Sequence, residues 1–269
     1  MIRTPLSTTS VLDEAADTVA ATVSWAGFLI ATAIPYRFLQ ALFLDQLMEV
    51  GSAAARYGNL LGATANMTVA TMLLSFWGRA VYARACRLAM SRGNTPGAEV
   101  WRVPRVALAS YVLTASAATL LGYVSLFTVF GFPIAVIVAG LAVGTLELND
   151  RISVSRPFAL LSRYAKKAHI LIALLFVLFC GLAVALVNVF FAFQLATWLT
   201  GAVAGFDAPQ WQRLFSPGNR RFTLMLFAGA LVLVEPFWIA AHVIFVRKAG
   251  AEESGDDLRA WFDELRRVA

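Results

Sequence analysis

The stretch VALASYVLTASAATLLGYVSLFTVFGFPIAVIVAGLAVGTL, residues 106–146, contains no charged side chain. A single helix of this length would be about 60 Å long, whereas the hydrocarbon layer of a bilayer is about 30 Å thick. Near the middle of the stretch, Gly131-Phe132-Pro133 favours a break in the helix. The stretch therefore predicts two membrane spans, one ending near Phe130 and the next beginning near Ile134.

Further apolar runs lie on either side of this pair. They are residues 18–36, 58–78, 168–199 and 222–246. Hydrophobic residues make up 59% of the chain and charged residues 14%, a balance that soluble domains rarely show. The run 168–199 is longer than the bilayer is thick, which predicts a tilted or protruding helix. We therefore predict an all-α, polytopic transmembrane bundle of six spans over residues 1–248.

Amphipathic segments accompany the predicted spans. Pro35, near the end of the first run, favours a bend in the chain, and beyond it apolar residues recur at helical spacing across 38–50, which predicts a helix along the membrane surface. The basic segment 151–167 predicts a second surface helix, on the cytoplasmic side. The tail, residues 249–269, predicts a cytoplasmic amphipathic helix whose apolar stripe docks on the bilayer, on this protein or on a partner. The stripe consists of Leu258, Trp261, Phe262 and Leu265.

The positions of the basic residues predict the orientation of the chain. With six spans, 17 Lys and Arg residues fall on the side of the N-terminus and 5 on the opposite side. If residues 106–146 formed one span, the partition would become 10 and 12, and the asymmetry would disappear. Because cytoplasmic loops carry an excess of Lys and Arg, this partition supports the helical hairpin and predicts that both termini are cytoplasmic.

Glu235 lies near the middle of the sixth predicted span, where an acidic side chain costs about 2.5 to 3.5 kcal/mol on insertion scales. His242 follows seven positions later, so both side chains point to one side of the helix. One hypothesis makes Glu235 a proton- or cation-binding group in a transport path, with His242 as a relay. The other makes Glu235 a protonated or paired carboxyl that ties helices together, with Asn66 or Asn188 as its partner. We favour the second hypothesis.

Small residues at helical spacing predict close helix packing. Gly140 and Gly144 have the small-xxx-small spacing of membrane helix contacts. A second face carries hydroxyl groups, and it either packs against a neighbouring helix or lines a path for a solute; we favour packing. It consists of Thr64, Thr68, Thr71 and Ser75. Such faces also suit association between copies of the chain.

Signatures of catalysis and of cofactor binding are absent from the sequence. His-Glu-x-x-His, Gly-x-Ser-x-Gly, P-loop and dinucleotide motifs do not occur. Cys86 and Cys180 are the only cysteines, which argues against a disulfide framework and a cysteine-based zinc site. The net charge of +6 arises from short clusters beside apolar runs, so a nucleic-acid surface is not expected. We expect no catalytic residues, metal ion or cofactor.

Residues in the C-terminal half carry a resemblance to a known family. They are Glu147, the segment Arg156-Pro157-Phe158-Ala159-Leu160, Pro236, Arg247 and Gly255-Asp256-Asp257-Leu258. In these features the chain resembles bacterial six-helix membrane proteins related to the membrane domain fused to some glycerophosphodiester phosphodiesterases. The resemblance implies an accessory or scaffold role in the cell envelope, and the phosphodiesterase domain itself is absent from this sequence.

The sequence thus predicts a non-enzymatic protein of the bacterial inner membrane, acting as a scaffold or accessory subunit of an envelope complex. Its expected partners are the lipid bilayer and other membrane or cytoplasmic proteins. The alternative is a small transporter or channel subunit that uses Glu235. Transport requires a polar, hydrated path beside Glu235, whereas a scaffold requires a dry carboxyl bonded to a neighbouring helix.

Overall fold

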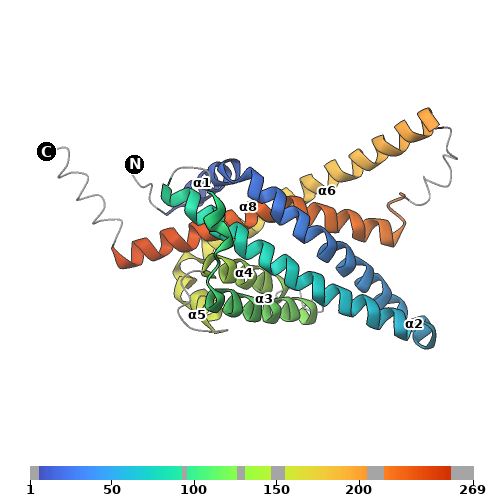
Figure 1. The fold of residues 1–269 in the computed structure, drawn as a ribbon, viewed down its shortest axis with the longest axis horizontal. Coiled ribbons are helices and arrows are strands. Elements are labelled where there is room, and N and C mark those ends of the chain that lie inside the picture. The colour runs from blue at the N-terminus through green and yellow to red at the C-terminus, as the bar shows by residue number, and fades with distance from the viewer. Residues whose placement is uncertain (1–5, 93–95, 126–130, 147–154, 205–214, 256–269) are drawn as a thin grey trace. The chain divides into compact units, whose positions relative to one another are not determined.

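A computed structural model describes residues 6–92, 96–125, 131–146, 155–204 and 215–255, apart from the side chains of 48–61, 92, 125, 156 and 204. The helices are α1 (Thr8–Ala21), α2 (Val23–Arg92), η1 (Ala98–Trp101), α3 (Arg105–Ser125), α4 (Gly131–Gly144), α5 (Arg156–Arg163), η3 (Tyr164–Lys167), α6 (Ala168–Ala204) and α8 (Arg220–Ser254) (Figure 1). No β-strand occurs among the described residues. The predicted all-α fold class is therefore confirmed.

Within the described residues, 4 helical segments are long and apolar enough to cross a membrane. They are Val23–Leu47, Arg105–Val124, Pro157–Val203 and Arg220–Ser254. Helix α4 is also apolar, but its 14 residues fall short of the about 20 that span a hydrocarbon layer. The chain is thus a helical membrane protein. The predicted spans 58–78 and 134–146 are not among these segments, so the number of six spans remains a prediction.

The apolar stretch 106–146 forms two helices, as predicted. Helix α3 ends at Ser125, and α4 begins at Gly131. Pro133 lies in the first turn of α4, where the backbone needs no N–H donor from it. The two helices lie side by side (Figure 1). The predicted helical hairpin is therefore present, whereas the charge partition also requires that both of its helices cross the membrane, which remains a prediction.

Pro35 does not separate the first predicted span from the segment that follows it. Helix α2 continues through Pro35, and its apolar segment extends to Leu47, so most of the predicted surface helix 38–50 belongs to the same helix as the first span. Proline is tolerated inside membrane helices where surrounding groups compensate for the lost backbone bond. The polar residues that made this segment look amphipathic include Asp45, which is buried.

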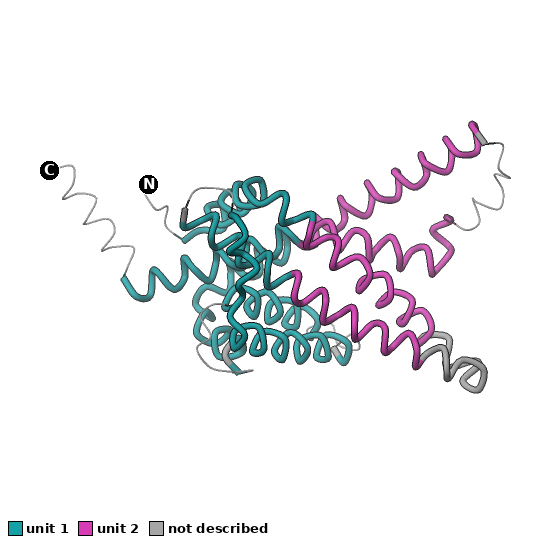
Figure 2. The backbone as a smooth tube through the Cα atoms, viewed as in Figure 1, with its two compact units in different colours: residues 1–27, 79–177, 236–269 teal, residues 28–78, 178–235 magenta. Residues whose placement is uncertain are grey.

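The chain divides into two compact units, which Figure 2 distinguishes by colour. Unit 1 comprises residues 1–27, 79–177 and 236–269, and unit 2 comprises residues 28–78 and 178–235. The predicted domain boundary after residue 248 falls inside α8, which continues to Ser254. Gly255 follows with a φ of 71°, a left-handed conformation that commonly ends helices.

In unit 2, helix α2 folds back on itself. Along a straight helix, Phe28 and Trp77 would be about 70 Å apart at 1.5 Å per residue, yet their ring centroids are 5.4 Å apart. Thr64 also donates a hydrogen bond to Gln46 across 2.6 Å. The segments before Gln46 and after Thr64 therefore form two antiparallel arms (Figure 1). Ser75, from the predicted hydroxyl face, is buried, which supports packing over a solute path.

In unit 1, helices α4 and α8 meet at the two glycines that the sequence singled out. A Cβ atom added to Gly140 would lie 2.3 Å from Cδ2 of His242. A Cβ atom on Gly144 would lie 2.8 Å from the backbone oxygen of His242 and 2.7 Å from Val246. These distances are shorter than van der Waals contact, so only glycine permits this approach of the helices. The predicted small-xxx-small packing face is confirmed.

Candidate functional site

Glu235 lies on α8 in unit 2, and it forms an ion pair with Arg37 on the first arm of α2. Its residue is 6% exposed, and its Oε2 atom is 3.6 Å from Nη2 of Arg37 on α2. Arg37 also donates a hydrogen bond from Nη1 to Gln40, at 3.0 Å, and its guanidinium carbon lies 5.3 Å from the centre of the Tyr36 ring. A carboxylate and a guanidinium group thus face each other between two apolar helices, as buried charges require.

The amides predicted as partners of Glu235 lie elsewhere. Asn188 is exposed on α6 and donates to the backbone oxygen of Val184 in its own helix, at 2.8 Å. Asn66 is exposed on the second arm of α2. Glu235 is therefore paired, as the hypothesis of a helix tie requires. Its partner is Arg37, and neither Asn66 nor Asn188.

The sequence contains a signal for Arg37 that hydropathy alone does not show. Arg37 follows Tyr36 directly, so it coincides with the end of the first apolar run. A basic residue and an acidic residue inside two different apolar runs are natural partners, since each is costly in hydrocarbon alone.

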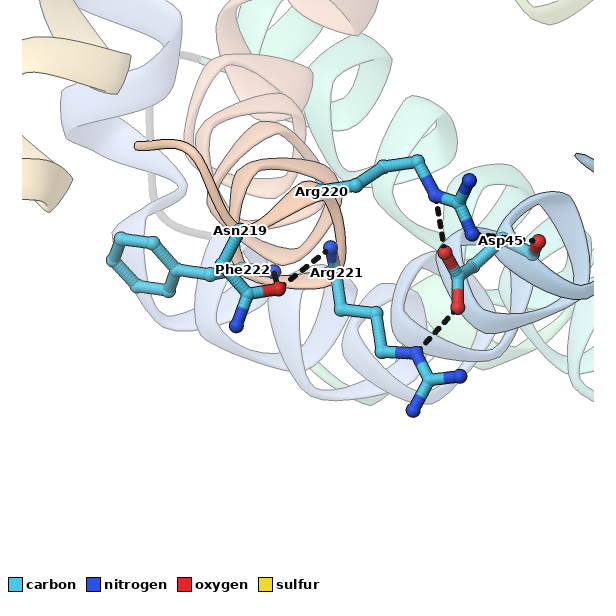
Figure 3. A network of polar contacts seen from close by, with 5 residues as sticks. All are labelled: Asp45, Asn219, Arg220, Arg221 and Phe222. Atoms are coloured by element: carbon cyan, nitrogen blue, oxygen red, sulfur yellow. Dashed lines mark hydrogen bonds and ion pairs between the residues drawn. The ribbon is translucent and has the colours of Figure 1, made fainter. Parts of the chain in front are cut away.

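A second ion cluster in unit 2 joins the first arm of α2 to the start of α8 (Figure 3). Asp45 is 1% exposed. Its Oδ1 accepts a hydrogen bond from Nε of Arg220 and its Oδ2 accepts one from Nε of Arg221, both at 2.6 Å. Asn219 precedes the helix and its side-chain oxygen accepts from the backbone N–H of Arg221 at 3.1 Å, which caps α8. The sequence analysis did not predict this cluster.

His242 lies in unit 1 and serves the contact between α4 and α8. It is fully buried, its Nδ1 is 3.0 Å from the backbone oxygen of Trp238, and its ring lies against Gly140. Glu235 belongs to unit 2 and His242 to unit 1, and the relay hypothesis that links them remains a prediction. The interactions that the structure does give His242 are those of a packing residue.

Ion pairs hold the last turns of α8 within unit 1. Arg163 of α5 pairs with Glu253 at 2.6 Å, and Lys167 of η3 pairs with Glu252. These contacts attach the basic segment 155–167 to the end of α8. The predicted docking stripe of Leu258, Trp261, Phe262 and Leu265 lies outside the described residues, as does Glu147 of the family resemblance.

No protein-family model, curated protein or solved structure matches this chain. Among the described residues, no group of three or more His, Cys, Asp and Glu side chains is arranged to hold a metal ion. The described part of unit 2 contains the two ion clusters given above. One of them, Arg37 with Glu235, ties the middle of one apolar helix to the middle of another.

Proposed function

We propose that this chain is a non-enzymatic scaffold or accessory subunit of an envelope complex in the bacterial cytoplasmic membrane. It crosses the membrane six times, with both termini in the cytoplasm. The observation that carries the proposal is the pairing of buried Glu235 with Arg37 on a neighbouring helix. The orientation is supported by the partition of basic residues, and the bacterial envelope by the family resemblance.

The pairing favours a scaffold because Arg37 neutralises the negative charge that a transport site at Glu235 would need. A carboxylate that binds and releases protons or cations requires water or polar groups along a path on both sides. Glu235 instead has an oppositely charged neighbour 3.6 Å away and almost no exposed surface. Removing one partner of such a pair leaves an uncompensated charge in an apolar environment, which is strongly destabilising. The pair therefore acts as a structural tie.

The alternative, a small transporter or channel subunit that uses Glu235, has one observation in its favour. The 3.6 Å between Oε2 of Glu235 and Nη2 of Arg37 is longer than a hydrogen bond. Protonation of Glu235 at that oxygen would break no short hydrogen bond to Arg37.

Flux measurements separate these two functions. The purified chain and its Glu235→Gln variant are reconstituted in liposomes, and proton and cation flux is followed at several pH values. The scaffold proposal predicts no flux above that of empty liposomes for either protein, together with a lower thermal stability of the variant. Flux that is present in the native chain and lost in a folded variant would establish transport instead.

A further inference from the structure

Asn188 is a polar residue in the most apolar helix of the described chain. Helix α6 belongs to the most apolar of the 4 segments that are long enough to cross a membrane. Between Ile170 and Val203 it carries no charged residue. About 20 residues span a hydrocarbon layer, and every stretch of that length between Ile170 and Val203 contains Asn188. If α6 crosses the membrane, Asn188 therefore lies within the hydrocarbon layer.

The amide of Asn188 has hydrogen-bonding groups to spare. The residue is exposed, and its Nδ2 donates to the backbone oxygen of Val184 at 2.8 Å. A primary amide has two N–H donors and one accepting oxygen, so a second N–H and the Oδ1 atom remain. Over the described residues, the bond to Val184 is the one that the Asn188 side chain makes. Polar groups without a partner are costly in hydrocarbon, which favours a further partner for this amide.

Asn188 lies on an exposed face of α6 that turns away from α8. Within unit 2, α6 contacts α8 through another side, where the rings of Phe190 and Phe222 have centroids 6.5 Å apart. The face of Asn188 recurs at helical spacing over about 22 Å and spans an arc of about 80°. Its exposed members are Val184, Asn188, Ala192, Leu195 and Leu199. Ala192, one turn beyond Asn188, is small and lets a second helix backbone approach closely.

A second copy of this chain is the partner that the amide fits. Because the distribution of Lys and Arg sets the orientation of a membrane protein, two copies insert in the same direction and bring α6 to the same depth. A twofold axis along the membrane normal then places the two Asn188 side chains opposite one another. An amide is complementary to itself, since the N–H of each can donate to the Oδ1 of the other. A single asparagine in an apolar helix seam also fixes the register of the pair.

We propose that α6 packs in parallel against α6 of a second copy, with reciprocal hydrogen bonds between the two Asn188 amides. Each amide keeps its bond to Val184, because Nδ2 has a second N–H for the partner. The contact requires that α6 crosses the membrane, and it is independent of the role of Glu235 and of the scaffold proposal.

The first test measures the dissociation constant of the dimer in a bilayer. The full chain, labelled at its C-terminus with a donor or an acceptor fluorophore, is reconstituted in liposomes over a range of protein-to-lipid ratios, and energy transfer is recorded. The variant Asn188→Leu removes the amide and keeps an apolar side chain that favours helices. The control Asn66→Leu makes the same change at another exposed asparagine of unit 2, outside the candidate spans.

The native chain should form dimers that dissociate on dilution with lipid. Asn188→Leu should weaken the dimer about tenfold, as expected for hydrogen bonds between membrane helices, whereas Asn66→Leu should leave it unchanged. A native chain that is monomeric at all ratios, an unchanged dissociation constant in Asn188→Leu, or equal losses in both variants would overturn the proposal.

The second test locates the contact on α6 in membranes into which the cell has inserted the chain. With Cys180→Ala as background, Leu195→Cys adds a thiol one heptad beyond Asn188, and copper phenanthroline serves as oxidant. The control Thr200→Cys adds a thiol at an exposed residue five positions further on, about 140° around the helix. Cys86 is buried. Disulfide-linked dimers should form at Leu195→Cys and not at Thr200→Cys. Equal yields at the two positions, or no dimer at Leu195→Cys, would overturn the proposed face.

Discussion

The two halves of α8 make contact with their neighbours by opposite means. In unit 1, His242 and Val246 lie against Gly140 and Gly144, and the contact depends on the absence of side-chain volume. In unit 2, Glu235 faces Arg37, and the contact depends on opposite charge in an apolar environment. One helix therefore shows two kinds of helix contact. Added side-chain volume should weaken the glycine contact, and an unpaired charge should weaken the ion pair.

The largest effect is expected from unpairing the buried charge. In Arg37→Gln, the carboxylate of Glu235 loses its cation, and we expect the free energy of unfolding to fall by about 3 to 5 kcal/mol. Introducing Glu235→Gln as well should restore part of this loss, because the double variant no longer buries a lone charge. Denaturant or thermal unfolding in detergent measures both variants. Losses that simply add in the double variant would show that the two side chains are not coupled.

Adding a methyl group to the glycine contact is expected to have the next largest effect. Gly144→Ala places a Cβ 2.8 Å from a backbone oxygen, which must shift, at a cost of about 1 to 3 kcal/mol. The matched control is Gly181→Ala on α6, whose Cβ would meet Val234 at an ordinary 3.8 Å. That control should be neutral or slightly stabilising, since alanine favours helices. The free energy of unfolding of both variants is measured under the same conditions. Equal effects would contradict the claim that the contact at Gly144 has no room for a side chain.

A smaller effect is expected at the cluster of buried Asp45 with the half-exposed Arg220 and Arg221. Asp45→Asn removes the carboxylate, but the side chains of Arg220 and Arg221 are half exposed and can turn toward solvent. We therefore expect a loss of only about 1 kcal/mol, smaller still in high salt. The measurement is the unfolding of the variant at low and high sodium chloride. A loss as large as that of Arg37→Gln would mean that exposure does not distinguish the two clusters.

The reactivity of the two cysteines tests the packing of each unit, and no substitution is needed. Cys86, in unit 1, is fully buried, and burial raises the pKa of its thiol to about 12 from an ordinary 9.0. An acid whose pKa is raised in the folded state stays protonated longer as pH rises, so Cys86 should remain a thiol, and unreactive, from pH 7 to 10. Cys180, in unit 2, is exposed on α6. In detergent, N-ethylmaleimide should modify Cys180 alone until the chain is unfolded, as peptide mass spectrometry would show. Modification of Cys86 at a rate similar to Cys180 would contradict the packing of unit 1.

Features that depend on neighbours in the sequence were predictable. The break at Gly131-Phe132-Pro133 follows from local backbone chemistry, and the packing at Gly140 and Gly144 follows from helical spacing. In both cases the signal lies within one or two turns of the sequence, although the glycine spacing did not identify α8 as the helix that packs there. The structure accordingly shows them where they were expected.

Features that depend on distant partners were not predictable from one sequence. Arg37 and Asp45 interrupted the hydropathy of the first arm, so the segment looked like a surface helix. Their partners, Glu235 and Arg220, are about two hundred residues away, and only the fold brings them together. Because these ion pairs bury the polar side chains, a segment that looks amphipathic in the sequence is part of the long helix α2.

Exchanging the two charges of the buried pair tests the central claim most directly. Arg37→Glu and Glu235→Arg each place two like charges beside one another, whereas the double variant restores an opposite pair in reversed order. If the pair is a structural tie, the double variant should unfold at a temperature well above that of either single variant and nearer to that of the native chain. A double variant no more stable than the worse single variant would show that Arg37 and Glu235 do not hold these helices together.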